Sequence, residues 1–388
     1  MSYPLAGIRV LDMSRVLAGP FAGRMLADLG ADVVKVEPPE GDVTRNWGAR
    51  INGQAGYFNQ QNVGKRGICV DLDVAGAADL IKQLVTRADV LIENFRPDVM
   101  GRLGLGYAIL QEINPRLVML SISGFGHDGP ESRRAAYAPI IHAESGLIAR
   151  QQKVTGSFAA DIAVSIADTN AALHGLVGLL SALLMRTTTG VGQHIDIAMI
   201  DAMLATDDHL HYTVDKAEHL KAMPSEVWDT AAGTLLIASD FRHVWKQLTR
   251  RAGVVDPTPA DATLEEKIEV RRKTARAFFK DLPDRAAVIK ALDAMNLAWG
   301  DVREGAAALQ LPTVQHRGTI TQVDDRGGGK RPVVQSPYRF SAASSGARGG
   351  SPRQGEHNDV VLTDWLGLES RAIGALHASG VLVSVDGE

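Results

Sequence analysis

The stretch IRVLDMSRVLAGPFAGRMLADLGADVVKVE, residues 8–37, contains the pattern of a strand, a helix and a second strand. The apolar run 8–13 predicts the first strand, and Pro20 stands where the first turn of a helix tolerates proline. Gly30 ends that helix. Residues 31–37 are apolar in their middle, as buried parallel strands are. The stretch therefore predicts one unit of a parallel sheet.

The same alternation of strand and helix continues to residue 123. Further strands are expected at 69–72, 88–94 and 116–123, and helices at 74–87 and 107–113. Alternation of this kind predicts an α/β protein with a doubly wound parallel sheet. Ligands of such sheets bind beyond the carboxyl ends of the strands. We therefore expect one rim to be formed by the loops after Met13, Leu72, Asn94 and Ser123.

This rim does not carry the signature of a dinucleotide site. Its first loop offers Gly19 and Gly23 but no G-x-G-x-x-G. The pattern therefore favours a βαβ unit with a structural role over one that binds a nicotinamide or flavin cofactor. Basic residues cluster around the rim, and they either belong to a solvated surface or hold a phosphorylated ligand. These residues are Lys65, Arg66, Arg96 and Arg102.

Asp168 stands where the polar loop before it becomes an apolar run, 171–185, which predicts a buried helix. That run is too short to span a bilayer. A turn at 190–192 and an alternating strand at 194–199 follow it. An aspartate at such a position is ordinarily a helix cap. It can also be a nucleophile towards an activated carbonyl, with a pKa lowered by the helix terminus.

The second half of the chain predicts a smaller α+β domain. A strand is expected at 233–238, and Thr263 with Glu266 forms a capping box for a helix. We expect a large domain at 1–221, the small domain at 222–315, and a segment at 316–388 that returns to the large domain. Gly327 to Gly329 fits a hairpin turn, and 341–352 reads as loop.

Composition excludes several classes of protein. The 388 residues are 45% hydrophobic and 22% charged with a net charge of −4, so bulk nucleic-acid binding is not expected. A single cysteine, Cys69, excludes an intrachain disulfide and favours a reducing cytoplasm. The start of the chain does not read as a signal peptide, and no membrane association is expected. The acid and histidine run 207–211 reads as a polar helix face and not as a metal site.

Several motifs in order resemble the class III coenzyme A transferases. The residues that carry the resemblance are LAGIRVLD at 5–12, AGP at 18–20, LADLGA at 26–31, KR at 65–66, ENFRP at 93–97, RLG at 102–104, NPRL at 114–117, SGFG at 123–126, SG at 145–146, SIAD at 165–168, TGVGQ at 189–193, DAML at 201–204 and GEH at 355–357. The resemblance is strong over 5–205 and weaker beyond.

The resemblance implies a Rossmann-like large domain, a small domain and an interlocked homodimer. It implies an acyl-CoA and a carboxylic acid as substrates, with no tightly bound cofactor and no metal. Asp168 takes the place of the family's nucleophile, which passes through an acyl-aspartyl anhydride and an aspartyl-CoA thioester. By the same resemblance the CoA site is lined by Val16, Ala18, Leu72, Asn94, Phe95 and Arg102, with Lys65 and Arg66 near the phosphates.

Two alternatives come with the resemblance. The same fold carries 2-methylacyl-CoA racemases, which use a histidine where this chain has Tyr137, although His127 and His142 are near in sequence. The second alternative is a non-catalytic acyl-CoA-binding paralogue. Departures from the family pattern are Pro38 for an arginine, Ala138 for an acid, Ala172 for a glycine, and the lack of a glycine-rich loop between about 205 and 260. Tyr137 favours transfer.

Overall fold

The structure is a computed structural model that describes residues 2–216 and 225–384. The chain divides into two compact units: Met1–Asp207 together with His316–Glu388, and Asp208–Gln315. The domain junction expected at 221 falls between the described ranges. Each unit is described by itself.

The first unit is built on a six-stranded parallel sheet. Its strands are β1 (Arg9–Asp12), β2 (Asp32–Glu37), β5 (Arg66–Cys69), β6 (Val90–Glu93), β7 (Val118–Ser123) and β8 (His194–Ala198), in the spatial order β5-β2-β1-β6-β7-β8. This is the order of doubly wound nucleotide-binding sheets, in which the direction of winding reverses between the first strand and the fourth. The predicted parallel α/β sheet is confirmed. The crevice for a ligand therefore opens between the loops after β1 and β6.

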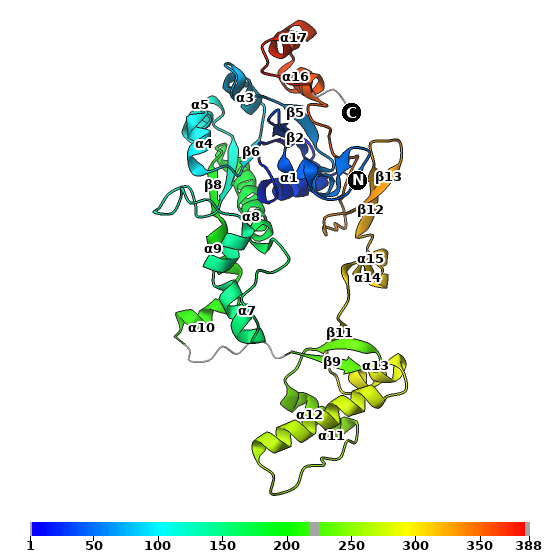
Figure 1. Cartoon of the computed structure of the whole chain (residues 1–388). Helices are drawn as coiled ribbons and strands as arrows, with labels where there is room; N and C mark the ends of the chain where they lie inside the picture. Colours follow the sequence, from blue (N-terminus) through cyan, green and yellow to red (C-terminus); the bar gives the residue numbers. More distant parts are fainter. Residues whose placement is uncertain (1, 217–224, 385–388) are drawn as a thin grey trace. The chain divides into compact units, whose positions relative to one another are not determined.

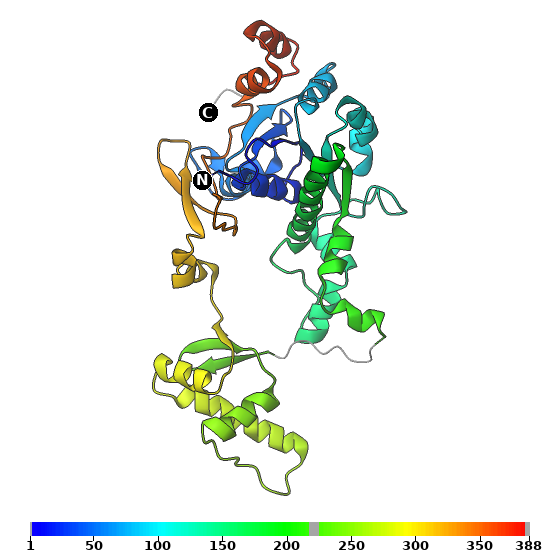
Figure 2. The same ribbon diagram turned by 180° about the vertical axis from the view of Figure 1, so that it is seen from behind.

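Helices cover both faces of the sheet (Figures 1 and 2). Alternate strand residues supply the two cores, as the twofold period of a strand requires. Val10 and Leu120 pack with α1 (Ala18–Asp28) and α8 (Ile166–Thr189). Leu11 and Met119 pack with the helices on the other face. Those helices are α3 (Ala77–Val85), α5 (Tyr107–Ile113), α16 (Asn358–Leu366) and α17 (Ser370–Ala378).

The remaining elements of this unit are short, and some of them pack into the two cores, through Met100, Ile141 and Met203. They are η1 (Val43–Asn46), β3 (Arg50–Ile51), β4 (Gln54–Ala55), α2 (Gly56–Asn62), α4 (Pro97–Arg102), α6 (Ala138–Glu144), α7 (Leu147–Thr155), α9 (Met199–Thr206), β12 (Ile320–Asp324) and β13 (Lys330–Val334). β12 and β13 pair antiparallel, and the three glycines lie in the turn between them, as predicted. The structure places short elements between 43 and 62, where an irregular loop was expected.

Two predicted boundaries are wrong. The strand expected at 69–72 is β5 at Arg66–Cys69, because the polar Lys65-Arg66 pair conceals the start of a buried strand. The helix expected at 171–185 is α8 at Ile166–Thr189. The polar residues Asp168, Thr169 and Asn170 resemble a helix cap, but they lie inside the first turns of this helix.

α8 is longer than its apolar run indicated. Among the described helices it alone has the length and apolar composition of a membrane span. One face of it packs into the core against β7 and β8, through Leu176, Leu179 and Leu183. The other face exposes apolar side chains at Leu173, Val177, Leu180 and Leu184. α8 is thus a core helix with a second apolar face that is exposed among the residues of the first unit that the structure describes.

The second unit has its own antiparallel sheet, in the order β11-β10-β9. Its elements are α10 (Leu210–Val214), β9 (Glu226–Thr230), β10 (Gly233–Ile237), α11 (Phe241–Arg251), α12 (Leu264–Asp281), α13 (Arg285–Ala294), β11 (Trp299–Asp301), α14 (Gly305–Ala308) and α15 (Pro312–His316). Thr263 and Glu266 form the predicted capping box at the start of α12. Trp228 and Phe279 are wholly buried in its core.

Candidate active site

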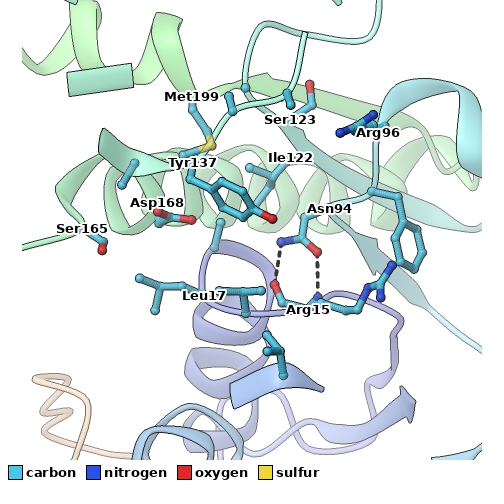
Figure 3. Close-up of a pocket in the computed structure, with 18 of the residues that line it drawn as sticks. Arg15, Leu17, Asn94, Arg96, Ile122, Ser123, Tyr137, Ser165, Asp168 and Met199 are labelled. Atoms are coloured by element: carbon cyan, nitrogen blue, oxygen red, sulfur yellow. Dashed lines mark hydrogen bonds between the residues drawn. The ribbon is translucent and has the colours of Figure 1, made fainter. Parts of the chain in front are cut away.

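A cavity of about 770 Å³ opens at the point where the winding of the sheet reverses. Its wall comes from the loops after β1, β6 and β7 and from the first residues of α1, α6 and α8. Of the residues predicted to bind CoA or react, it is lined by Val16, Ala18, Asn94, Phe95, Tyr137 and Asp168. Figure 3 shows Tyr137, Asn94 and Asp168 around this cavity.

A second cavity of about 260 Å³ adjoins the first. It is lined by Leu72 and Arg102, the other two apolar or basic residues predicted to hold CoA, and by Pro38. The two cavities share lining residues Arg15, Glu40, Phe95 and Val99. An extended ligand can therefore run from Leu72 past Phe95 to Asp168.

Asn94 joins the two loops that border the crevice. Its Oδ1 accepts the backbone N–H of Arg15 at 2.7 Å, and its Nδ2 donates to the Arg15 carbonyl at 2.8 Å (Figure 3). The Arg15 guanidinium lies over the Phe95 ring, 5.2 Å from its centroid. The pairing fixes a cation and an aromatic face where the two cavities meet, and these groups suit a phosphate and a base.

Asp168 is the third residue of α8, and the first residues of two other helices lie against it. The backbone amides of Ala18 and Ala138, at the starts of α1 and α6, lie close enough to its carboxyl to lower its pKa, as does its own amide. Helix starts carry unpaired N–H groups and a partial positive charge. The carboxyl, and any oxyanion formed on it, therefore faces several donors.

Burial affects the pKa of the Asp168 carboxyl more strongly than these amide groups do. Loss of water raises the pKa of Asp168 to about 6, although the amides of Ala18 and Ala138 lower it. The prediction that the helix terminus lowers this pKa is therefore wrong in sign, because desolvation is the larger effect. Ala138 was expected to supply no partner to the reaction. Its side chain supplies none, and its backbone amide takes that place.

Lys65 and Arg66 line neither of these two cavities, and their place near the CoA phosphates stays a prediction. The Lys65 ammonium is fully buried and donates to Asp12 Oδ2 at 2.7 Å and to the Pro20 carbonyl at 2.9 Å. Arg66 pairs with Asp32 and Asp364, and Asp32 is the first residue of β2, at the amino end of the sheet. Arg15, Arg96 and Arg134 are the cations that line the larger cavity.

The two histidines near the site are both engaged. His142 is buried, its Nε2 accepts the Ala167 N–H at 3.2 Å, and its Nδ1 lies 2.8 Å from Asp161 Oδ1. This arrangement places the proton on Nδ1 and fixes the first turn of α8. His127 lies 2.9 Å from Asp196 Oδ1 and 3.4 Å from Glu93 Oε1. Burial opposes its charge, but these carboxylates raise the pKa of His127 to about 9, so it is already protonated at neutral pH.

Three further lining residues carried no signal in the sequence. Trp47 and Tyr57 make an edge-to-face contact with ring centroids 5.2 Å apart, and both line the larger cavity. Burial, with the charge of Asp168, raises the pKa of Tyr57 to about 12. Arg134 lies over the Phe125 ring and pairs with Glu131 and Glu144. Trp47 and Tyr57 lie in the segment 41–62, which the sequence predicts as irregular loop, so only the folded chain brings them to Asp168.

Comparison with known proteins agrees with this geometry. The sequence matches CoA-transferase family III over residues 5–358. It is 33% identical to a succinate–glutarate CoA-transferase of Agrobacterium fabrum, over 95% of this chain and 97% of that protein. It is 31% identical to a succinyl-CoA–D-citramalate CoA-transferase of Chloroflexus aurantiacus, over 98% of each. The crystal structure of a CAIB/BAIF family protein from Brucella suis superposes with a TM-score of 0.79 at 31% identity, covering 94% of this chain and all of that one.

The chain is therefore an enzyme of the CoA-transferases, and it belongs to CoA-transferase family III.

Proposed function

We propose that this enzyme moves coenzyme A from an acyl-CoA to a carboxylic acid through covalent intermediates on Asp168. The observation that carries the proposal is the place of Asp168. Its carboxyl is desolvated, faces the amides of Ala18 and Ala138, and lies in the same cavity as Asn94 and Phe95. A desolvated carboxylate is a stronger nucleophile, and amides aimed at the site stabilise the oxyanion that its attack creates.

The reaction has two halves. The Asp168 carboxylate attacks the thioester carbonyl, the C–S bond breaks, and an acyl-aspartyl anhydride and CoA thiolate result. The thiolate attacks the aspartyl carbonyl, releasing the first carboxylate and leaving an aspartyl-CoA thioester. The acceptor carboxylate then attacks this thioester, and the thiolate released takes the acceptor's acyl group from the new anhydride. Asp168 returns as a carboxylate, and no proton is gained or lost.

We propose a short dicarboxylic acid as one of the two acids. The relatives named above act on succinate, glutarate or citramalate, each of which has a second carboxylate. A second carboxylate needs a cation or a set of donors close to the reacting one. Arg134 lines the cavity that holds Asp168 and supplies such a cation.

The racemase alternative lacks its histidine among the described residues that line the cavity. A racemase must take a proton from the carbon next to the thioester. None of the described residues that line this cavity is a histidine. Both ring nitrogens of His142 are engaged, and His127 is protonated. Transfer therefore agrees better with the geometry than proton exchange does.

Two parallel incubations separate the alternatives. The purified enzyme is mixed with succinyl-CoA and glutarate in deuterated water, and in a second sample with a chiral 2-methylacyl-CoA. We expect CoA to appear on glutarate and no deuterium on the carbon next to the thioester. Deuterium without transfer would make the protein a racemase. Binding of CoA without either reaction would make it a non-catalytic paralogue.

Arg96 lines the larger cavity and Arg102 the smaller one, and both are expected to hold the CoA phosphates. Replacing Arg96 or Arg102 with glutamine should raise the KM for the acyl-CoA about 10-fold and leave kcat within about 2-fold, because a contact remote from the reaction is the same in the ground and transition states. Arg87→Gln is the matched control, since Arg87 is exposed and precedes β6 at the opposite edge of the sheet. A fall in kcat with KM unchanged would place these arginines in the chemical step instead.

We also propose that the enzyme works as a homodimer. Leu173, Val177, Leu180 and Leu184 are spaced four, three and four residues apart, so they form one stripe along α8, and all are exposed in the single chain. An exposed apolar stripe of this kind marks a contact surface. A second copy of the chain covering it would also explain why a helix so apolar is only half-buried.

A further inference from the structure

The turn between β1 and α1 is strained. Val16 has φ of +68°, a left-handed conformation that a β-branched side chain rarely adopts. Val16 lines the cavity, and two residues later Ala18 begins α1 with its amide towards the Asp168 carboxyl. Strain of this kind persists only where the surroundings enforce it, and it gathers at functional sites.

A buried ion pair enforces this conformation from both sides of Arg15. The Lys35 ammonium, wholly buried on β2, donates to the Ser14 carbonyl at 2.8 Å. It also lies 3.1 Å from Asp42 Oδ2, and the same oxygen accepts the Val16 N–H at 3.2 Å. Asp42 is itself fixed, because its Oδ1 accepts the Thr44 N–H at 3.0 Å. The pair thus fixes the positions of Ser14 and Val16, the residues before and after Arg15.

Both partners are charged. Burial opposes the charge of Lys35, but Asp42, Asp12 and Glu37 raise its pKa. Burial likewise opposes the charge of Asp42, but Lys35 and the Thr44 donors lower its pKa to about 2. A buried ion pair adds little stability beyond what apolar side chains of the same size would add. We therefore attribute to the Lys35–Asp42 pair the positioning of the Ser14–Val16 turn, and not a gain in stability.

A second buried ion pair in the same region does not contact the Ser14–Val16 turn. Arg24 and Asp28 are one helical turn apart on α1, 2.7 Å from each other and as buried as Lys35 and Asp42. Their other contacts are the carbonyls of Gln60 and Val334 and the Ser336 amide. They hold the C-terminal segment against α1 and do not touch the turn.

We propose that Lys35 and Asp42 are positioning residues, which hold the strained Ser14–Val16 turn so that the Ala18 amide is aimed at the Asp168 carboxyl. The proposal rests on the proposed function, since the amide is useful because Asp168 reacts. Neither Lys35 nor Asp42 lines the cavity, so neither is placed to touch the substrate.

The test replaces one buried pair and compares it with the other. The double variant Lys35→Met with Asp42→Asn removes the pair without leaving one buried charge alone, and Arg24→Met with Asp28→Asn does the same to the control pair. We expect kcat for transfer to fall about 10²-fold in the first variant and to stay within about 3-fold in the second, because misplacing a catalytic group by about 1 Å has effects of this size. If the first variant fails to fold, Lys35→Gln with Asp42→Asn serves, since it likewise removes both charges and keeps the Thr44 contact.

A second readout does not depend on turnover. The Asp168 carboxyl carbon is followed by NMR against pH, with Asp168→Asn identifying its signal. The titratable groups that face Asp168 are His142 on α6 and Tyr57 on α2. Loss of the Ala18 amide should raise the midpoint by about one pH unit in the first variant and leave it unchanged in the control.

The outcomes are distinct. A folded first variant with the midpoint and kcat of the control would overturn the positioning proposal. If the wild-type enzyme transfers CoA between no pair of acids, the proposed function fails, and the NMR midpoint alone decides whether Lys35 and Asp42 aim the amide.

Discussion

Replacing Asp168 with asparagine is expected to abolish CoA transfer, with kcat falling at least about 10³-fold, because removing a covalent nucleophile leaves only binding and oxyanion stabilisation. The amide has the shape of the carboxylate, so the cavity and its contacts should survive. The measurement is the steady-state rate of CoA transfer between two dicarboxylic acids, with binding of CoA followed separately. We expect CoA to bind this variant within about 3-fold of the wild-type affinity, because the contacts that bind CoA do not involve the nucleophile and are unchanged by its loss.

Asp201→Asn is the matched control for this variant. Asp201 is the third residue of α9, as Asp168 is of α8, but it is exposed and lies outside the cavity. It should keep full activity. Equal losses in the two variants would show that helix stability, and not nucleophilic attack, is what the aspartate supplies.

The raised pKa of Asp168 adds a pH dependence with a definite sign. Because the carboxylate attacks and its pKa is about 6, kcat/KM should fall as pH drops through about 6 and not through the ordinary range near 4. A raised carboxyl pKa means that the folded protein holds the proton more tightly than the unfolded chain. Ionised Asp168 thus destabilises the fold above pH 6, and this penalty disappears below about pH 4. Asp168→Asn should therefore gain about 1–2 kcal/mol over wild type at about pH 8, after allowance for partial exposure, and nothing at about pH 4.

The second large effect is expected from Gly19→Ala. Gly19 is the second residue of α1, and a Cβ there would lie 2.1 Å from the Cβ of the buried Ser14 and 2.3 Å from its Oγ. These distances cannot be accommodated without moving the Ser14–Val16 turn. We expect kcat to fall about 10²-fold, because the Ala18 amide moves with the turn, and the free energy of unfolding to fall by about 1–3 kcal/mol from overpacking.

Gly374→Ala provides the comparison for this variant. Gly374 lies inside α17, and nothing lies within 4 Å of a Cβ added there. Alanine is the better helix former, so this change should stabilise the protein by up to about 1 kcal/mol and leave transfer unchanged. Chemical denaturation and the transfer assay are run on both variants. If Gly19→Ala loses stability but keeps its kcat, the turn tolerates displacement and its position is not critical to the reaction.

The sheet could be predicted because its signals are local. Apolar runs such as 31–37, separated by amphipathic helices, predict buried parallel strands, and the rule for such sheets places the ligand at their carboxyl ends. The residues predicted there, Asn94 and Phe95 among them, do line the cavities. Asp168 was also predicted to stand at the site, and the fold brings it there across the β1–β6 crevice.

The features that the sequence could not predict depend on partners distant in the sequence. Lys65 reads as a surface cation until the fold brings Asp12 within 2.7 Å of it. The amides that face Asp168 belong to Ala18 and Ala138, and no local pattern shows that these helix starts meet α8. The sign of the Asp168 pKa shift depends on how much water the folded chain removes. The spacing of residues along the chain does not show how far folding removes water from Asp168.

The central claim, that Asp168 carries the acyl group and then CoA, is tested most directly by trapping. The enzyme is mixed with succinyl-CoA in the absence of an acceptor, quenched with hydroxylamine, digested and examined by mass spectrometry. Hydroxylamine converts an aspartyl anhydride or thioester to a hydroxamate. We predict a hydroxamate on the peptide that contains Asp168, at that residue, and none in the Asp168→Asn variant. Transfer activity together with an unmodified Asp168, or a hydroxamate at Asp161 or Glu144 in its place, would contradict the mechanism.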